Sequence, residues 1–331
     1  MVRLTTVVEN HSWMPMPLVE LHIPLPEGLA ADFGVKHGGL WRTELVYRTY
    51  LLPRQRVTFQ QDVLCAERGL HRITKTEIKL GDGLGLSTLF EELETPLSLL
   101  VRPRPVTEDG LLLRCEELIG ETAVQRWYQE DASRLQGVRS YQAGDPYRFI
   151  HWAASARSNQ LMVKQFETTS ETTLYVIPNA QFFDAHWAGG VKSVSEFQYR
   201  VAATLLWMAS ERQFSCGLCT NAAWQGAGWL LQAADRGPGH LDLLLGLLGG
   251  LTRQAQCSYA ELLRFFRERV SQASTLLLIT PYWSDELEDV LRLLLGDRHR
   301  VLILTTTEDA AVWQGIDPAV SVVVLNQEEA S

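Results

Sequence analysis

The chain has 331 residues, and its 46% hydrophobic fraction is enough for two ordinary domain cores. A formal net charge of -9, from 39 acidic and 30 basic residues, argues against binding to nucleic acid or anionic lipid. The five cysteines have no regular spacing, which is typical of a reduced compartment rather than of a disulfide-stabilised domain.

No stretch of the sequence reaches the roughly 18 uninterrupted apolar residues that a membrane span requires. The N-terminal residues lack the apolar core of a signal peptide. The run Leu241–Leu251 is too short to span a bilayer and predicts a buried helix. We therefore expect this chain, which has no transmembrane segment, in the cytoplasm or at the cytoplasmic face of the cell membrane.

Residues 1–105 contain short β-like runs separated by glycine, proline and asparagine turns, and they predict a β-sandwich domain. The prolines at 103 and 105 then impose extended geometry on the exit from this domain. A connecting segment follows over residues 106–171. The predicted strands are Val2–Val8, Leu18–Ile23, Glu44–Leu52, Arg56–Leu64, Ile73–Leu80 and Leu97–Val101.

Residues 172–331 alternate compact apolar strands with helical segments, which predicts a largely parallel, doubly wound α/β domain. Phe197, Val201, Leu205 and Met208 form one apolar helical stripe. The predicted strands are 174–177, 216–220, 276–280, 301–305 and 320–325, and the predicted helices are 195–212, 241–251, 259–270 and 284–295. The expected fold class is thus multidomain α+β.

The segment from Gly137 to Glu167 combines charged and aromatic residues at short intervals. Gly144, Asp145 and Pro146 are typical of a turn leading into a helix, with Asp145 as the side-chain cap and Pro146 at the first helical position. We predict a helix that runs to about Arg157.

Ser158 and Asn159 predict the end of that helix, and a strand follows over residues 161–166. Within the predicted helix, Arg148 and Trp152 are four residues apart and share a face.

This signature segment resembles the hallmark of the bacterial domain of unknown function 58 family, approximately G-x-R-x-Y-x-x-G-D-x-x-R-x-I-x-W-x-x-[ST]-A-R-x-x-x-L. A weaker resemblance lies upstream, where Arg68-Gly69 and residues 81–86 are similar to an R-G … D-P-L-G-L element, with Gly83 in the place of the proline. The positions that match the hallmark are Gly137, Arg139, Tyr141, Gly144, Asp145, Arg148, Ile150, Trp152, Ser155, Ala156, Arg157 and Leu161.

The resemblance implies that the second domain is similar to a von Willebrand factor A domain. Members of the family are typically encoded beside a MoxR-type AAA ATPase, and often beside transglutaminase-like membrane proteins. Many carry two membrane helices before the region that begins here, so membrane contact is expected if such an anchor precedes this chain. The oligomeric state is not indicated.

A working von Willebrand factor A domain holds a divalent cation with an Asp-x-Ser-x-Ser motif after its first strand. The corresponding residues here are Asn179, Ala180 and Gln181, so we expect a degenerate site without metal. Cys216 and Cys219 lie three apart within a predicted strand, so their thiols face opposite sides and are expected to be structural. No cofactor is indicated.

The sequence lacks a phosphate-binding loop, a nucleophile elbow and a zinc-protease motif, so no catalytic residue is assigned. Two interpretations of the signature stay open. In one, Asp145 pairs with Arg148 and Trp152 seals the domain junction. In the other, the signature receives an acidic partner surface through a basic patch, made of Arg139, Arg148, Arg157 and Lys164.

The leading hypothesis is a non-enzymatic adaptor that works with a MoxR-type AAA ATPase in the assembly of envelope-associated complexes. The alternatives are an envelope enzyme that uses Asp145, Arg148 and His151, and a membrane-tethered structural protein. The residues assigned to partner binding or to the signature are Arg139, Tyr141, Gly144, Asp145, Arg148, Trp152 and Arg157.

Overall fold

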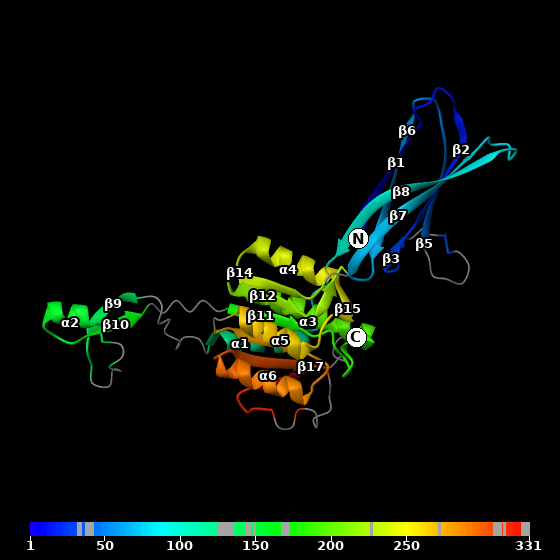
Figure 1. The fold of residues 1–331 in the computed structure, drawn as a ribbon. Helices are drawn as coiled ribbons and strands as arrows, with labels where there is room; N and C mark the ends of the chain where they lie inside the picture. Colours follow the sequence, from blue (N-terminus) through cyan, green and yellow to red (C-terminus); the bar gives the residue numbers. More distant parts are fainter. Residues whose placement is uncertain are drawn as a thin grey trace.

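A computed structural model of the chain describes residues 1–31, 35–36, 43–124, 135–142, 147, 150–166, 173–225, 228–270, 273–306, 313 and 316–325. Figure 1 shows three parts: the N-terminal sheets, a central part with a helix-covered sheet, and a small lobe made of β9 Leu135–Ser140, α2 Trp152–Ser158 and β10 Met162–Phe166. The mixed α and β composition that the sequence predicts is confirmed.

The N-terminal strands form two sheets, with strand orders β1-β6-β3 and β4-β5-β2-β7-β8. A small shared core joins them, because Val63 of β6, Leu45 of β5 and Ile73 of β7 belong to one buried cluster. Each predicted run is a strand, and the structure adds β3 and β4. The strands are β1 Val2–Glu9, β2 Met16–Pro24, β3 Leu29–Ala31, β4 Val35–Lys36, β5 Thr43–Leu51, β6 Arg56–Cys65, β7 Gly69–Gly81 and β8 Thr88–Val101.

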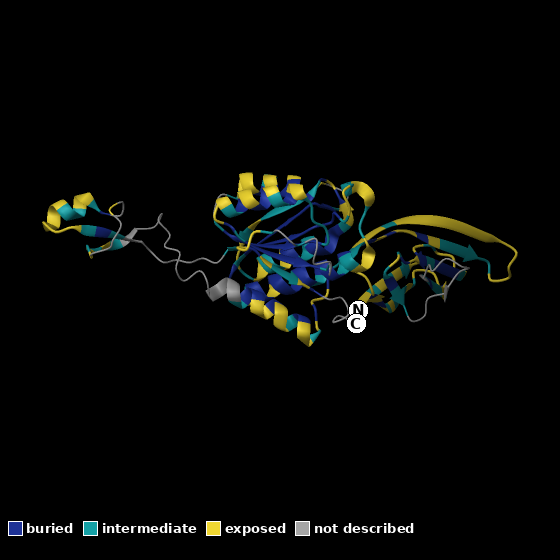
Figure 2. Cartoon of the chain, turned by 90° about the horizontal axis from the view of Figure 1, so that it is seen from below, coloured by how far each residue is buried: buried dark blue, intermediate teal, exposed yellow. Residues whose placement is uncertain are grey.

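The hairpin of β7 and β8 extends beyond this small core and is largely exposed along β8 (Figure 2). Its loop is ordered by Asp82, whose carboxylate accepts backbone N–H groups from Leu84, Gly85, Leu86 and Ser87 at 2.8–3.3 Å. The loop therefore holds Leu84 and Leu86 in solvent on a fixed backbone, at 80% and 83% exposure.

The central sheet has the strand order β14-β12-β11-β16-β17-β18. Its pairs are parallel except for the edge strand β14, which runs antiparallel to β12. These short apolar runs are buried because helices lie on both faces. The strands are β11 Thr173–Pro178, β12 Ser215–Thr220, β14 Leu230–Asp235, β16 Thr275–Ile279, β17 Arg300–Thr305 and β18 Ser321–Val324.

Alternation along each strand divides the core between the two faces. Leu174 and Val176 of β11 pack beneath one group of helices, while Tyr175 and Ile177 pack beneath the other. The first group is α1 Asp109–Val124, α3 Lys192–Glu211 and α4 Pro238–Gly250, and the second is α5 Tyr259–Arg269 and α6 Asp285–Gly296.

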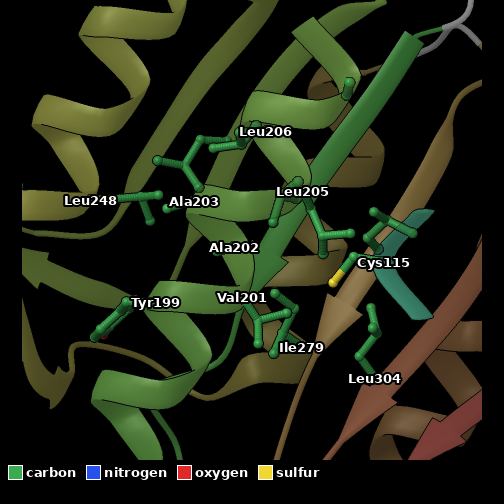
Figure 3. Close-up of a cluster of buried hydrophobic side chains, with 14 of the residues drawn as sticks. Cys115, Tyr199, Val201, Ala202, Ala203, Leu205, Leu206, Leu248, Ile279 and Leu304 are labelled. Atoms are coloured by element: carbon green, nitrogen blue, oxygen red, sulfur yellow. The ribbon is translucent and has the colours of Figure 1, made fainter. Parts of the chain in front are cut away.

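Helix α3 presents the predicted stripe of Phe197, Val201, Leu205 and Met208 to the first core, and all four side chains are buried. Figure 3 shows Val201 and Leu205 in this core. Helix α1 was not predicted. It lies in the segment expected to connect two domains, yet its Leu111, Cys115 and Ile119 join the same core. Among the described helices, none is long and apolar enough to cross a membrane.

Candidate functional site

The signature residues form a small lobe of their own, which we call the signature lobe. Strands β9 Leu135–Ser140 and β10 Met162–Phe166 pair antiparallel, and helix α2 Trp152–Ser158 packs against β10. Ile150 adds a single bridge to Val163, and both side chains are only 3% exposed. No other side chain among the described lobe residues is buried, so this pair is the centre of the apolar packing seen there.

The helix of the signature lobe begins later than the sequence predicts. Its N-cap is His151, whose Nδ1 accepts the backbone N–H of Ala154 at 3.1 Å, and its first residue is Trp152 rather than Pro146. The cause is pairing: the Ile150 bridge and a 2.8 Å bond from the His151 N–H to the Met162 carbonyl hold residues 150–151 against β10. Asp145 and Pro146, the predicted cap and first helical position, lie outside the described residues.

Ser155 fastens the helix to the strand. Its hydroxyl donates to the His151 carbonyl at 3.0 Å and accepts the Met162 N–H at 2.8 Å. Asn159 ends the helix in the left-handed conformation, with φ of 54°, as the sequence predicted. Ser155 is a fixed position of the family pattern, and its role here is to join two elements.

The structure places four of the seven assigned residues and leaves three outside the described residues. Arg139 lies on β9, Trp152 begins α2, and Arg157 is in its last turn. Tyr141 stacks on Tyr147, with ring centroids 6.3 Å apart. Gly144, Asp145 and Arg148 lie outside the described residues, and so does the Asp145–Arg148 pair.

Trp152 does not seal a domain junction. Its side chain is 68% exposed, and Tyr147 is 75% exposed. The interpretation in which Trp152 seals the domain junction is therefore wrong, because the side chain lies on the solvent side of the helix. His151, the proposed base of the enzyme hypothesis, uses Nδ1 as a helix cap, while its two proposed partners lie outside the described residues.

The described basic side chains of the signature lobe do not all lie on one face, and Arg148, the fourth residue of the predicted patch, lies outside the described residues. Arg139 and Lys164 occupy adjacent register positions across the β9–β10 pair and so point to opposite faces. Arg157 is exposed on the helix. The described residues of the lobe include no Asp or Glu, so its described surface is positive on a chain of net charge -9.

A second polar site lies where β11, β12 and β16 end, the edge at which open α/β sheets bind ligands. Asn179 donates through Nδ2 to Thr280 Oγ1 at 2.9 Å, and its Oδ1 accepts from the Gln181 N–H and from Asn221 Nδ2. Gln181 Oε1 accepts the Tyr259 N–H at 2.8 Å. The four polar side chains are almost fully buried, so the amides are occupied by one another.

This amide network contains Asn179 and Gln181, the residues at which the sequence predicts a degenerate cation site. Its oxygens are neutral and already accept hydrogen bonds, whereas Mg²⁺ prefers carboxylates and free hydroxyls. Within the described part of the chain, no cluster of His, Cys, Asp and Glu has the geometry of a metal site. The nearby Asp184 instead accepts the Tyr282 hydroxyl at 2.6 Å.

The cysteines of β12 lie as predicted. Cys216 packs in the core beneath α3, Cys219 packs in the core on the opposite face, and both are free thiols. Burial raises the pKa of Cys216 to about 12, so it is a protonated, unreactive thiol at neutral pH.

Arg68 is a junction residue that sequence reasoning missed. Its side chain, 5% exposed, leaves the start of β7 and enters the central part, with Nε 2.9 Å from Glu196 Oε2 of α3. Nη1 donates to the carbonyls of Leu248 at 2.9 Å and Leu251 at 2.8 Å, which suits the negative end of α4. The guanidinium lies 3.9 Å from the ring centroid of Tyr199. The only sequence signal was the Arg68-Gly69 element.

Two comparisons place these sites among known proteins. Residues 137–322, from β9 in the signature lobe to β18, match the family described as "Protein of unknown function DUF58". An uncharacterized protein, YeaD of Bacillus subtilis (strain 168), is 28% identical over 187 residues. That alignment covers 55% of this chain and 45% of the relative, so the chain spans about half the length of the curated relative.

Proposed function

Because this chain belongs to the DUF58 family of proteins of unknown function, we propose its role from its own surfaces: it is a non-enzymatic interaction module that binds a protein partner through the signature lobe. The exposure of the signature side chains carries this proposal. Trp152, Tyr147 and Arg157 are all exposed, on a lobe whose described residues carry only positive charge. Tryptophan, tyrosine and arginine are the residues most enriched among binding hot spots.

The partner surface that suits this lobe is acidic with apolar pockets. A positive surface attracts an acidic one before contact, and the exposed rings then supply apolar area on binding. We propose that the partner is a MoxR-type AAA ATPase, and that the pair acts at the cytoplasmic face of the membrane in assembling envelope-associated complexes.

We also propose that the central part is of the von Willebrand factor A type. The strand order β14-β12-β11-β16-β17-β18, with one antiparallel edge strand and helices on both faces, supports this assignment. In this proposal the amide network of Asn179, Gln181 and Asn221 replaces the cation site, and the domain acts as a scaffold.

A pull-down with a MoxR-type AAA ATPase from the same organism, with and without nucleotide, tests the proposal. Trp152→Ala and Arg157→Glu should each reduce capture, and the effect of Arg157→Glu should shrink as salt rises because exposed charges are screened over about 10 Å at 0.1 M. Trp187→Ala is the matched control, since Trp187 is equally exposed on the short 3₁₀ helix 186–188, outside the lobe.

The two variants must also melt like the parent, which circular dichroism measures. Capture that is unaffected by either substitution in the lobe contradicts the proposed surface. Equal losses with Trp187→Ala contradict it as well, because they would place the binding site elsewhere.

A further inference from the structure

A cavity of about 700 Å³ lies at the junction of the N-terminal sheets and the central part. Its volume is within the range of small-molecule sites. Residues of both parts line it. Those used in the argument are Arg68 just before β7, Arg72 of β7, Gly190 just before α3, Glu196 of α3, Gly250 at the end of α4 and Arg253 of β15 Leu251–Ala255.

The charges of this cavity do not balance. Glu196 is paired with Arg68, and Glu67 is paired with Lys192 at 2.6 Å, so both lining carboxylates are neutralised. Arg72 and Arg253 are exposed, come from different parts of the molecule, and have no ion-pair partner among the described residues. The cavity thus holds two uncompensated cations on a chain of net charge -9.

The wall behind these arginines is rigid and rich in donors. The Arg68 guanidinium is held in place by Glu196 and by the carbonyls at the end of α4. The first turn of α3, which follows Gly190, has no side-chain cap, and helix N-termini attract anions.

Two buried polar groups behind the same wall lack a protein partner. They are Ser195 Oγ, adjacent to Gly190, and Trp224 Nε1, adjacent to Gly250. Buried polar groups of this kind are normally satisfied, by protein, water or ligand. An arrangement of free arginines, an uncapped helix start and unsatisfied polar groups is the chemistry of an anion site.

We propose that this junction cavity binds a small molecule bearing oxyanion groups, carboxylate or phosphate, held between Arg72 and Arg253. Arginine presents paired N–H donors that match either group in a bidentate manner. Because the two arginines belong to different parts of the chain, the bound anion joins those parts. This site is independent of the signature lobe.

Isothermal titration calorimetry tests the site, with citrate and inorganic phosphate as probes at constant ionic strength. The parent should give a saturable heat with at least one anion. Arg72→Gln and Arg253→Gln should each weaken it about tenfold, the worth of one charge-assisted contact, and the double variant more. Arg56→Gln/Arg114→Gln is the matched control: both residues are exposed, neither has an ion-pair partner among the described residues, and neither lines the cavity.

The comparison of probes identifies the source of the oxyanion. Tighter binding of citrate indicates a carboxylate ligand, and tighter binding of phosphate indicates a phosphorylated one. The absence of saturable heat with both anions overturns the proposal, and so does an equal loss in the Arg56→Gln/Arg114→Gln control. A double variant at 72 and 253 that binds like the parent also overturns it.

Discussion

Arg157 and Arg68 show how differently one residue type is used in two regions of this molecule. Arg157 stands in solvent on the signature lobe, within the densest motif of the sequence. Arg68 belongs to the weaker Arg68-Gly69 element, yet it is buried and bound to Glu196 and to the end of α4. A residue in a dense sequence motif is therefore not always one that holds the fold together. Arg68 makes contacts across the junction, whereas Arg157 is exposed on the lobe.

The largest expected effect on the stability of the whole chain is at the junction. Arg68→Ala removes the cation from a mostly buried pair and leaves the α4 carbonyls without their donor, so we expect a loss of about 3 kcal/mol in the free energy of unfolding. Urea unfolding followed by fluorescence measures it. Arg157→Ala is the control and should leave the midpoint unchanged, because its side chain is exposed. Equal midpoints for the two variants would remove the contrast between them.

We expect the signature lobe to unfold independently of the rest of the chain. Ile150→Ala empties half of its small apolar core, and large-to-small changes at buried sites typically cost about 2–5 kcal/mol. We expect residues 150–166 to exchange their amide hydrogens faster while the main melting transition stays in place. Leu277→Ala, in the core of the central sheet, should lower that main transition instead. A lower main transition for Ile150→Ala would mean that the lobe and the central part unfold together.

The sequence was informative where structure depends on local patterns. Alternation predicted the N-terminal strands, and the Phe197–Met208 stripe predicted α3. Helix α1 also has a signal in the sequence, since Leu111, Cys115 and Ile119 recur at intervals of four, although we predicted only a connecting segment there.

Other features depended on partners distant in the chain. Helix α2 begins at Trp152, directly after the bridge from Ile150 to Val163, and no local pattern in the sequence predicts that pairing. Arg68 meets Glu196 and Leu248, which lie more than a hundred residues later, and no spacing rule connects them. Local chemistry therefore predicted the elements of the molecule, while the contacts between elements needed the structure.

Buried and exposed polar groups should also differ in their response to pH. His299 is buried, its Nδ1 accepts the Ser274 N–H at 3.2 Å, and burial lowers its pKa below 6.5. The unfolded chain therefore binds a proton at His299 at a higher pH than the folded chain does. The contribution of neutral His299 to the free energy of unfolding is fully present above about pH 6.5 and is lost as the pH falls below that value. Unfolding curves from pH 7.5 to 5 should show a stability slope that is smaller in His299→Asn. Identical slopes would mean that His299 does not titrate on unfolding.

A smaller, local effect is expected at the start of α2. His151→Ala removes the side chain that accepts the Ala154 N–H, and a helix cap is worth about 1 kcal/mol. We expect faster amide exchange at Ala154, with the main melting transition unchanged. His151→Asn restores a capping side chain and should recover most of the protection. Protection at Ala154 that is the same in parent and alanine variant would show that the cap contributes nothing.

The smallest effect is expected from divalent cations at the end of the central sheet. The Asn179 and Gln181 oxygens are neutral, buried and already accept hydrogen bonds, so they do not offset the dehydration of a hard cation. Titration with Mg²⁺ or Mn²⁺ in a calorimeter should give only the heat of dilution, and melting in either salt should match melting in a monovalent salt of equal ionic strength. This edge would then be a structural counterpart of Arg68, with polar groups that serve the fold by binding one another. A stoichiometric, micromolar heat that Asn179→Ala abolishes would instead make it a cation site, and the amide network would be the resting form of a binding site.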